Sequence, residues 1–297
     1  MITRRCTQRQ FLLRPSKFLK HALLFILARA AERFGIQLHA ACVLSSHLHL
    51  LVTDPGKNIS RFMCWVDSIV ARFLNARYGR WENFFAQPKS FNCVKLLDVD
   101  AVLRKLVYIL TNPVEAGLVS SGVRWPGLRL APSRLGRPEI IERPNFFFRE
   151  DGPVPEHATL KIVKPPAFDD ISDEEYKERV KAAVLQREEE IRKEFAASGK
   201  KFLGEKKVLA QSIHGRPDNR EPRMQQEPHV ACRDMWRRIA ALKERQEFLG
   251  DYREALKEFC DRMKRRSTDA LKVVFPMGIY QMCERYGVRC VGPPVPL

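Results

Sequence analysis

The sequence lacks the features that mark several common classes of protein. Its eight cysteines are scattered, and no two of them have the C-x-x-C spacing that typically holds zinc or forms a redox pair. The most apolar segment, FLKHALLFILARAAERFG, carries too many charges to cross a bilayer, and no signal-like cleavage pattern follows the basic N-terminus. We therefore expect a cytoplasmic protein with no membrane partner, whose cysteines are reduced thiols.

Acidic residues are scarce relative to basic ones. The 297 residues include 52 Lys and Arg against 35 Asp and Glu, which gives a formal net charge of +17. Such an excess attracts polyanions through its long-range field and through counterion release. Nucleic acid is therefore the first partner to consider, and a basic surface that serves only solubility is the alternative. With 45% hydrophobic residues, the chain can bury the core of one large or two modest domains.

The first part of the chain alternates between strand and helix patterns. Strands are expected at 9–14, 37–44, 47–53 and 90–97, and helices at 16–34, 58–78 and 100–111. Asn58 and Asp100 are the expected N-caps of the last two helices. The order strand, helix, strand, strand, helix, strand, followed by an extra helix, is that of the split βαβ motif. We predict an α+β fold with a ferredoxin-like βαββαβ antiparallel sheet and its helices on one face.

Composition changes twice along the rest of the chain. Prolines and glycines are frequent and periodicity fades in 126–171, which we expect to be a connecting region with limited structure. The remainder, 172–297, is predicted to be helical and basic, and is a candidate DNA contact. A capping box at Ser172 begins a charged helix that runs to about Ala197 and is expected to be a solvated surface helix. The compact domain is thus predicted to span 1–125.

Two histidines lie one residue apart in the strand expected at 47–53, in the stretch HLHLLV. Alternation along a strand puts His47 and His49 on the same face. Two imidazoles placed in this way can converge on one metal ion. Pairs of this kind also arise by chance and bind nothing, so both interpretations stay open at this point.

The helix that precedes Asn112-Pro113 has a second arrangement of polar residues. Arg104, Tyr108 and Asn112 follow each other at intervals of four, so they share the side opposite the apolar stripe. A tyrosine hydroxyl presented there can serve as a nucleophile, and an amide oxygen one turn further on can face a cation. The alternative is that Tyr108 covers the sheet edge and Asn112 only caps the helix before Pro113.

The two motifs together resemble a known family. The motif HLHLLV is followed by YILTNPVEAG, and NARYGRWENFFAQ lies between them. With these motifs, the segment from about Arg4 to Leu118 resembles the single-tyrosine HUH transposases, particularly the REP-associated tyrosine transposases. The resemblance implies the HUH nuclease fold, with Tyr108 as the nucleophile and His47, His49 and Asn112 as the metal-binding residues. One departure is that Ser45-Ser46 stand where the family often has Pro-Asn before the first histidine.

The resemblance also implies an activity. Members of this family cleave and rejoin single-stranded, hairpin-containing DNA through a 5′-phosphotyrosine, with a divalent metal that is magnesium or manganese, as monomers or homodimers. Basic side chains and one tryptophan that can stack on an unpaired base are the expected DNA contacts: Arg4, Arg5, Arg9, Arg104, Lys105, Trp81, Arg216, Arg220 and Arg223. Of Trp81, Phe84 and Phe85, at least two are expected to pack in the core instead.

Two other functions fit the same sequence. One is a domesticated DNA-binding protein that still recognises repetitive hairpin elements but no longer transposes. The other is an unrelated basic α+β domain that binds RNA on its sheet, although the expected strands carry no ladder of exposed aromatic residues.

Overall fold

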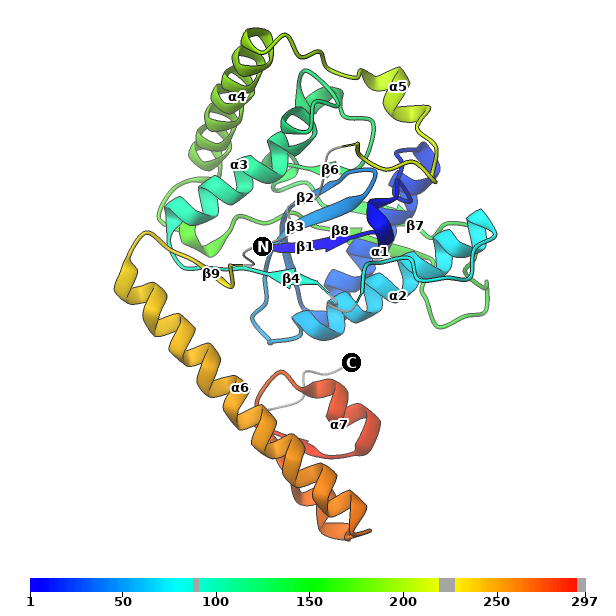
Figure 1. The fold of residues 1–297 in the computed structure, drawn as a ribbon, viewed down its shortest axis with the longest axis vertical. Coiled ribbons are helices and arrows are strands. Elements are labelled where there is room, and N and C mark those ends of the chain that lie inside the picture. Colours follow the sequence, from blue (N-terminus) through cyan, green and yellow to red (C-terminus); the bar gives the residue numbers. More distant parts are fainter. Residues whose placement is uncertain (88–90, 219–227, 293–297) are drawn as a thin grey trace.

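Five strands form one antiparallel sheet at the centre of the fold (Figure 1). The computed structural model describes residues 1–87, 91–218 and 228–292. The strands of the sheet are β1 (Ile2–Arg5), β2 (Gln37–Val43), β3 (His47–Thr53), β4 (Asn92–Cys93) and β6 (Arg129–Leu130). Their order is β4-β1-β3-β2-β6, and every neighbouring pair is antiparallel. This architecture agrees with the predicted α+β class.

Helices cover both faces of the sheet. Helices α1 (Lys17–Phe34) and α2 (Ile59–Tyr78) pack on one face, and α3 (Val99–Glu115) and α4 (Asp173–Ala197) lie on the other. The side chains of β3 alternate between the two cores that lie on the two faces of the sheet. Leu48 and Leu50 are buried in the core with α1 and α2, whereas Leu51 is buried in the core with α3. His47 and His49 have the parity of Leu51 and so face α3.

The ends of α1 and α2 follow local signals in the sequence. The Ser16 side chain accepts a hydrogen bond from the Leu19 amide at 3.0 Å, and Gly35 and Gly79 end the two helices with φ of 65° and 62°. The predicted cap of α2 is wrong, since the Asn58 side chain makes no capping hydrogen bond.

Asp54 takes the capping role instead. Its carboxylate accepts hydrogen bonds from the Asn58 and Ile59 amides at 2.8 and 2.7 Å. The Asn58 side chain turns inward and donates to the Phe34 carbonyl.

The strand predicted at 9–14 is wrong. The first strand is β1, and it is followed by a 3₁₀ turn at Thr7–Arg9 in which Gln8 and Arg9 have positive φ. Such a backbone cannot continue an extended strand. The strand expected at 90–97 is divided at Val94 into β4 and β5 (Lys95–Leu96), and β5 pairs in parallel with β9 (Val230–Ala231).

Helix α3 is longer at both ends than predicted. Its cap is Asp98, whose carboxylate accepts from the Ala101 amide at 2.6 Å, and the helix continues through Asn112 and Pro113 to Glu115. Proline is tolerated here because it removes one backbone donor near the end of the helix, and the chain completes the turn beyond it. Asn112 therefore lies inside the helix, so it is not a cap.

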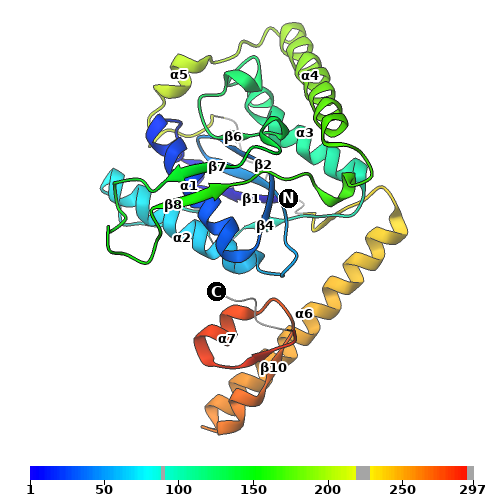
Figure 2. The ribbon, with the colours of Figure 1, turned by 180° about the vertical axis from the view of Figure 1, so that it is seen from behind.

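The expectation of limited structure in 126–171 is also wrong. Strand β6 joins the edge of the sheet, and β7 (Glu139–Glu142) and β8 (His157–Leu160) form a hairpin against α1, as Figure 2 shows. Ile141, Ala158 and Leu160 are buried in the core with α1. This segment is ordered by contacts with distant parts of the chain. Its own sequence therefore shows no periodicity from which the strands could be predicted.

Helix α4 begins at its predicted cap, with the Ser172 hydroxyl accepting from the Glu175 amide at 3.1 Å. It is not simply a solvated helix, because Tyr176, Val180 and Ile191 are buried against α3. One of its acidic residues, Glu188, is buried too and accepts a hydrogen bond from the Gly122 amide at 2.8 Å.

The last part of the chain forms a small module with a core of its own. It contains α6 (Met235–Lys264), β10 (Val274–Phe275), α7 (Tyr280–Tyr286) and β11 (Arg289–Cys290), and α6 extends away from the sheet (Figure 1). A short helix, α5 (Glu205–Leu209), precedes the module. Elsewhere in the described chain, further 3₁₀ turns lie at Gly122–Arg124, Pro132–Arg134, Pro166–Phe168 and Thr268–Lys272. None of the described helices is long and apolar enough to cross a membrane.

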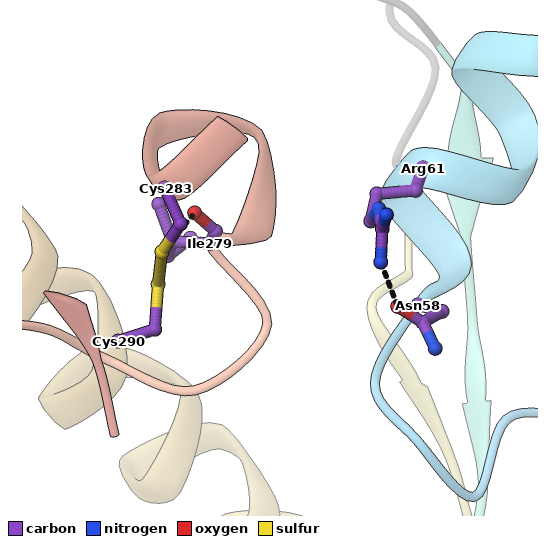
Figure 3. Close-up of a disulfide and its surroundings, with 5 residues drawn as sticks. All are labelled: Asn58, Arg61, Ile279, Cys283 and Cys290. Carbon is purple, nitrogen blue, oxygen red and sulfur yellow. Dashed lines mark hydrogen bonds between the residues drawn. A yellow bond between two sulfur atoms is a disulfide. The ribbon is translucent and has the colours of Figure 1, made fainter. Parts of the chain in front are cut away.

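A disulfide joins two of the cysteines in this module. Cys283 of α7 and Cys290 of β11 are bonded to each other, so the expectation that all eight cysteines are reduced thiols is wrong for this pair (Figure 3). The sequence hides the pair because the residues are seven apart and meet only through the turn at Gly287. Glu284 of α7 also pairs with Arg61 of α2 and thereby joins the module to the sheet domain.

Candidate active site

Strand β3 presents two imidazoles side by side toward α3. The ring centroids of His47 and His49 are 4.8 Å apart, and the planes of the rings are nearly perpendicular. Both histidines lie in the first half of the strand, which is held on one side by β1 and on the other by β2. The pair is therefore fixed by a strand in the interior of the sheet.

Helix α3 brings a tyrosine and an asparagine to the same place. The Tyr108 ring centroid lies 5.3 Å from that of His49. The buried side chain of Asn112 lies close enough to His47 and Tyr108 to shift the pKa of both. The four side chains singled out in the sequence thus meet at one site, although they come from two elements that are far apart along the chain.

A hydroxyl group lies next to the Nδ1 atom of each of the two imidazoles. The Thr3 hydroxyl of β1 lies 3.0 Å from His49 Nδ1, and the Ser46 hydroxyl lies 3.1 Å from His47 Nδ1. Partners at Nδ1 orient the rings and leave each Nε2 for another ligand. His49 Nε2 is buried and has no hydrogen-bond partner within the described ranges. A buried polar atom of this kind is open to an outside partner such as a metal ion or an ordered water.

The protonation states suit metal binding. Burial lowers the pKa of His47 to about 4, although the nearby Asn112 side chain acts in the opposite direction. Burial also lowers the pKa of His49 well below its usual value, with further effects in the same direction from His47 and Lys105. Both imidazoles are therefore neutral near pH 7, which is the form that binds a metal ion. Burial raises the pKa of Tyr108, so its hydroxyl keeps its proton in the resting protein.

The residues present fit a divalent cation. Two imidazole nitrogens and one carboxamide oxygen, from His47, His49 and Asn112, are donors that such ions accept. Within 1–87, 91–218 and 228–292, no cluster of three or more His, Cys, Asp or Glu side chains could hold a metal. Any third protein ligand at this site would be a group of another kind, such as the carboxamide oxygen of Asn112.

The site opens into a cleft of about 810 Å³. His47, His49 and Tyr108 line one side of it, and we call these three residues together with Asn112 the floor. The opposite side is formed by residues 203–218, which we call the strap. Four basic side chains line the cleft: Arg5, Arg9, Lys207 and Arg216.

The predicted DNA contacts lie in different places relative to this cleft. Arg5, Arg9 and Arg216 line it, and the Lys105 ammonium lies 5.5 Å from the centroid of the Tyr108 ring. Arg104 is exposed and lines, with Tyr108, a smaller cleft of about 360 Å³ between α3 and α4.

Of the other predicted DNA contacts, Trp81 does not line the cleft. Trp81 is 89% exposed, whereas Phe84 and Phe85 are buried, as expected for at least two of these three aromatic residues. Arg220 and Arg223 lie outside the described residues.

Arg4 needs a correction, because it belongs to the core. Its side chain is buried, forms an ion pair with Asp67 of α2 at 2.7 Å and donates to the Ala86 carbonyl at 2.9 Å. The guanidinium also lies over the Phe85 ring at 4.7 Å. Alternation along β1 turns Arg4 toward α2 and Thr3 toward the floor. We therefore leave Arg4 out of the DNA contacts.

Sequence reasoning missed several residues of the cleft. Thr3 escaped notice because β1 was expected further along the chain. Lys207 and Gln211 lie in a stretch with no clear pattern, and their position becomes evident only when the strap is seen opposite the floor.

Comparison with known proteins supports a class of protein for the first part of this chain. Residues 2–93 match the family described as "Transposase IS200 like". The match includes β1, β3 and the histidine pair, covers under a third of the chain and ends before α3. Searches of curated proteins and of solved structures find no match.

The family match supports a DNA transposase of the IS200-like kind, and therefore DNA as the partner. Transposases of this family generally use a divalent metal. Tyr108 and Asn112 lie outside the matched residues, so their place in the site comes from the geometry alone.

Proposed function

We propose that this chain is a metal-dependent transposase that cleaves and rejoins single-stranded, hairpin-containing DNA through a 5′-phosphotyrosine intermediate. The observation that carries the proposal is that Tyr108 and the histidine pair meet in one basic cleft, with Asn112 next to them. The order β4-β1-β3-β2 within the sheet supports a ferredoxin-like HUH nuclease fold. The REP-associated type rests on the motifs HLHLLV and YILTNPVEAG.

Tyr108 acts as the nucleophile in this proposal. Its hydroxyl oxygen attacks the scissile phosphorus, the bond from phosphorus to the 3′ oxygen breaks, and the tyrosine proton is lost as the 3′ oxygen gains one. The products are a 5′-phosphotyrosine and a free 3′-hydroxyl. Because α3 is packed against the sheet and the Tyr108 ring packs against that of His49, the side chain is positioned before DNA binds.

His47, His49 and Asn112 would hold the cation. A divalent ion bound there, magnesium or manganese, supplies Lewis-acid stabilisation of the charge on the phosphate oxygens. The two imidazoles contribute by remaining neutral and by keeping the orientation that Ser46 and Thr3 give them.

Strand transfer is the reverse of the first step. The phosphotyrosine retains a phosphodiester, so a second 3′-hydroxyl can attack it and release Tyr108 without an external energy source. Single-stranded DNA fits this chemistry because in-line attack by a side chain is hindered in a duplex.

The test is covalent capture of the intermediate. Labelled single-stranded DNA that contains a hairpin is incubated with the protein and magnesium, and the adduct is resolved on a denaturing gel. We expect Tyr108→Phe to abolish the adduct. The control is Tyr78→Phe, which removes a tyrosine hydroxyl that bonds to the Leu12 carbonyl in the same domain, away from the cleft, and should retain the adduct.

An adduct that persists in Tyr108→Phe refutes the nucleophile. DNA binding by the parent protein without any adduct would favour the domesticated DNA-binding protein instead.

A further inference from the structure

The strap crosses the cleft from one side to the other. At its start, the Leu203 amide donates to the Gly117 carbonyl at 2.8 Å, just beyond the end of α3. At its far end, the Phe11 amide donates to the Gly215 carbonyl at 2.9 Å, in the loop that follows β1. The strap therefore joins the helix that carries the tyrosine to the strand that supports the histidines (Figure 1).

The middle of the strap is held by specific contacts. The Ser45 hydroxyl donates to Gln211 Oε1 at 2.6 Å, and Arg14 donates to the Gln211 carbonyl at 2.8 Å. Val208 is fully buried in the core that contains α3. These contacts fix the strap as a wall of the cleft.

Two cations on the strap are directed to the cleft. Lys207 and Arg216 are exposed and line it, and neither forms an ion pair within the part of the chain that the structure describes. Asp218 is the single acidic side chain among the described residues of the lining. Arg5 and Arg9 also line the cleft, so basic groups reach it both from the strap and from the start of the chain.

We propose that the strap is a phosphate-binding wall, in which Lys207 and Arg216 bind backbone phosphates of a single DNA strand next to the scissile phosphate. This inference rests on the proposed function, because it takes the cleft to be the DNA site. Cations that line the cleft neutralise a backbone that runs through it and release its counterions. The strap would thereby contribute affinity and position the strand, while the floor carries out the chemistry.

The test compares two double variants with equal loss of charge. Lys207→Gln with Arg216→Gln removes both cations of the strap from the cleft. Lys201→Gln with Lys206→Gln removes two exposed lysines from the same stretch, neither of which lines the cleft. Binding of a labelled single-stranded hairpin oligonucleotide is measured by fluorescence anisotropy over a range of salt, in a Tyr108→Phe background so that no adduct forms.

We expect the cleft pair to weaken binding and to reduce the slope of log affinity against log salt by about 1.4, since each phosphate contact on a single strand contributes about 0.7. The control pair should leave this slope nearly unchanged. Equal slopes for the two variants would overturn the strap proposal. Matching thermal midpoints establish that both variants are folded.

The outcome for the strap is separable from that for catalysis. If the parent forms no tyrosine adduct but the two slopes still differ, the strap binds DNA and the proposed reaction is wrong. If the parent forms the adduct and the slopes agree, the reaction stands and the strap does not bind the phosphates.

Discussion

The floor and the strap enclose the same cleft but are built in opposite ways. The floor consists of side chains on β3 and α3, and His49 and Asn112 are only 3% and 6% exposed. The strap is mostly irregular chain around the short helix α5, and its cations Lys207 and Arg216 are exposed. One wall is rigid and uncharged near pH 7, and the other is charged and held by a few hydrogen bonds.

In the proposed function, the floor and the strap have different roles because they differ in burial and charge. Burial fixes the orientation of the floor residues and keeps the imidazoles neutral, which favours metal binding and directed attack. Exposure lets the strap keep its charge, which favours attraction to a phosphate backbone. Changes in the floor should therefore alter the rate at saturating DNA, and changes in the strap should alter the affinity.

The largest effect is expected from removing an imidazole of the floor. His49→Ala removes a nitrogen of the proposed metal site, so we expect adduct formation at saturating DNA and magnesium to fall by at least about 100-fold. DNA affinity by anisotropy should change by less than about twofold, because the imidazole is buried and neutral. His21→Ala, an exposed histidine of α1, is the matched control. Equal adduct yields in His49→Ala and the parent would remove His49 from the metal site.

Local periodicities indicated which floor residues share a face, but their joint role was implied only by the resemblance of the two motifs to the HUH transposases. Alternation along β3 puts His47 and His49 on one face, and a spacing of four along α3 puts Tyr108 and Asn112 on one side of that helix. The sequence alone could not show that these two surfaces face each other. That juxtaposition depends on how α3 packs on the sheet.

Strand β1 was missed because its pattern is polar although it lies inside the sheet. Arg4 is buried only because Asp67, far along the chain, lies opposite it on α2. No local pattern reveals such a pair. For the same reason Thr3, its neighbour, could not be assigned a role next to His49.

Apart from Arg216, the strap was missed for a related reason. Residues 203–218 have little periodicity, and their backbone hydrogen bonds go to Gly117 and Phe11, which belong to other parts of the chain. The hairpin of β7 and β8 was missed in the same way, since α1 supplies the surface that orders it. When a segment is ordered by contacts with residues far away in the chain, its local sequence predicts only a loop.

An intermediate effect is expected from the support behind the floor. Thr3→Val keeps the shape of the side chain but removes the hydroxyl that lies 3.0 Å from His49 Nδ1. Loss of such a supporting group typically costs about 10- to 100-fold in metal affinity or activity. We therefore expect adduct formation to require more magnesium in this variant, as measured by titrating the metal at saturating DNA.

The control for this substitution comes from the same sheet. Thr53→Val removes a hydroxyl that bonds to another buried histidine, His39, at 2.8 Å but lies outside the cleft. It should leave the magnesium requirement unchanged. If both variants shift the requirement equally, the effect reflects the stability of the sheet and Thr3 has no particular part in the site.

The smallest effect is expected where the two walls touch. Ser45→Ala removes the hydroxyl that donates to Gln211 Oε1 at 2.6 Å, a hydrogen bond that contributes about 1 kcal/mol. Because the Arg14 contact and the buried Val208 still hold the strap, we expect DNA affinity to fall only about two- to fivefold, within what that energy allows. The adduct rate at saturating DNA should stay the same, since the floor is intact. Ser212→Ala, on the exposed part of the strap, should change neither quantity. A Ser45→Ala variant with normal affinity and a slower adduct rate would reverse the division of work between the two walls.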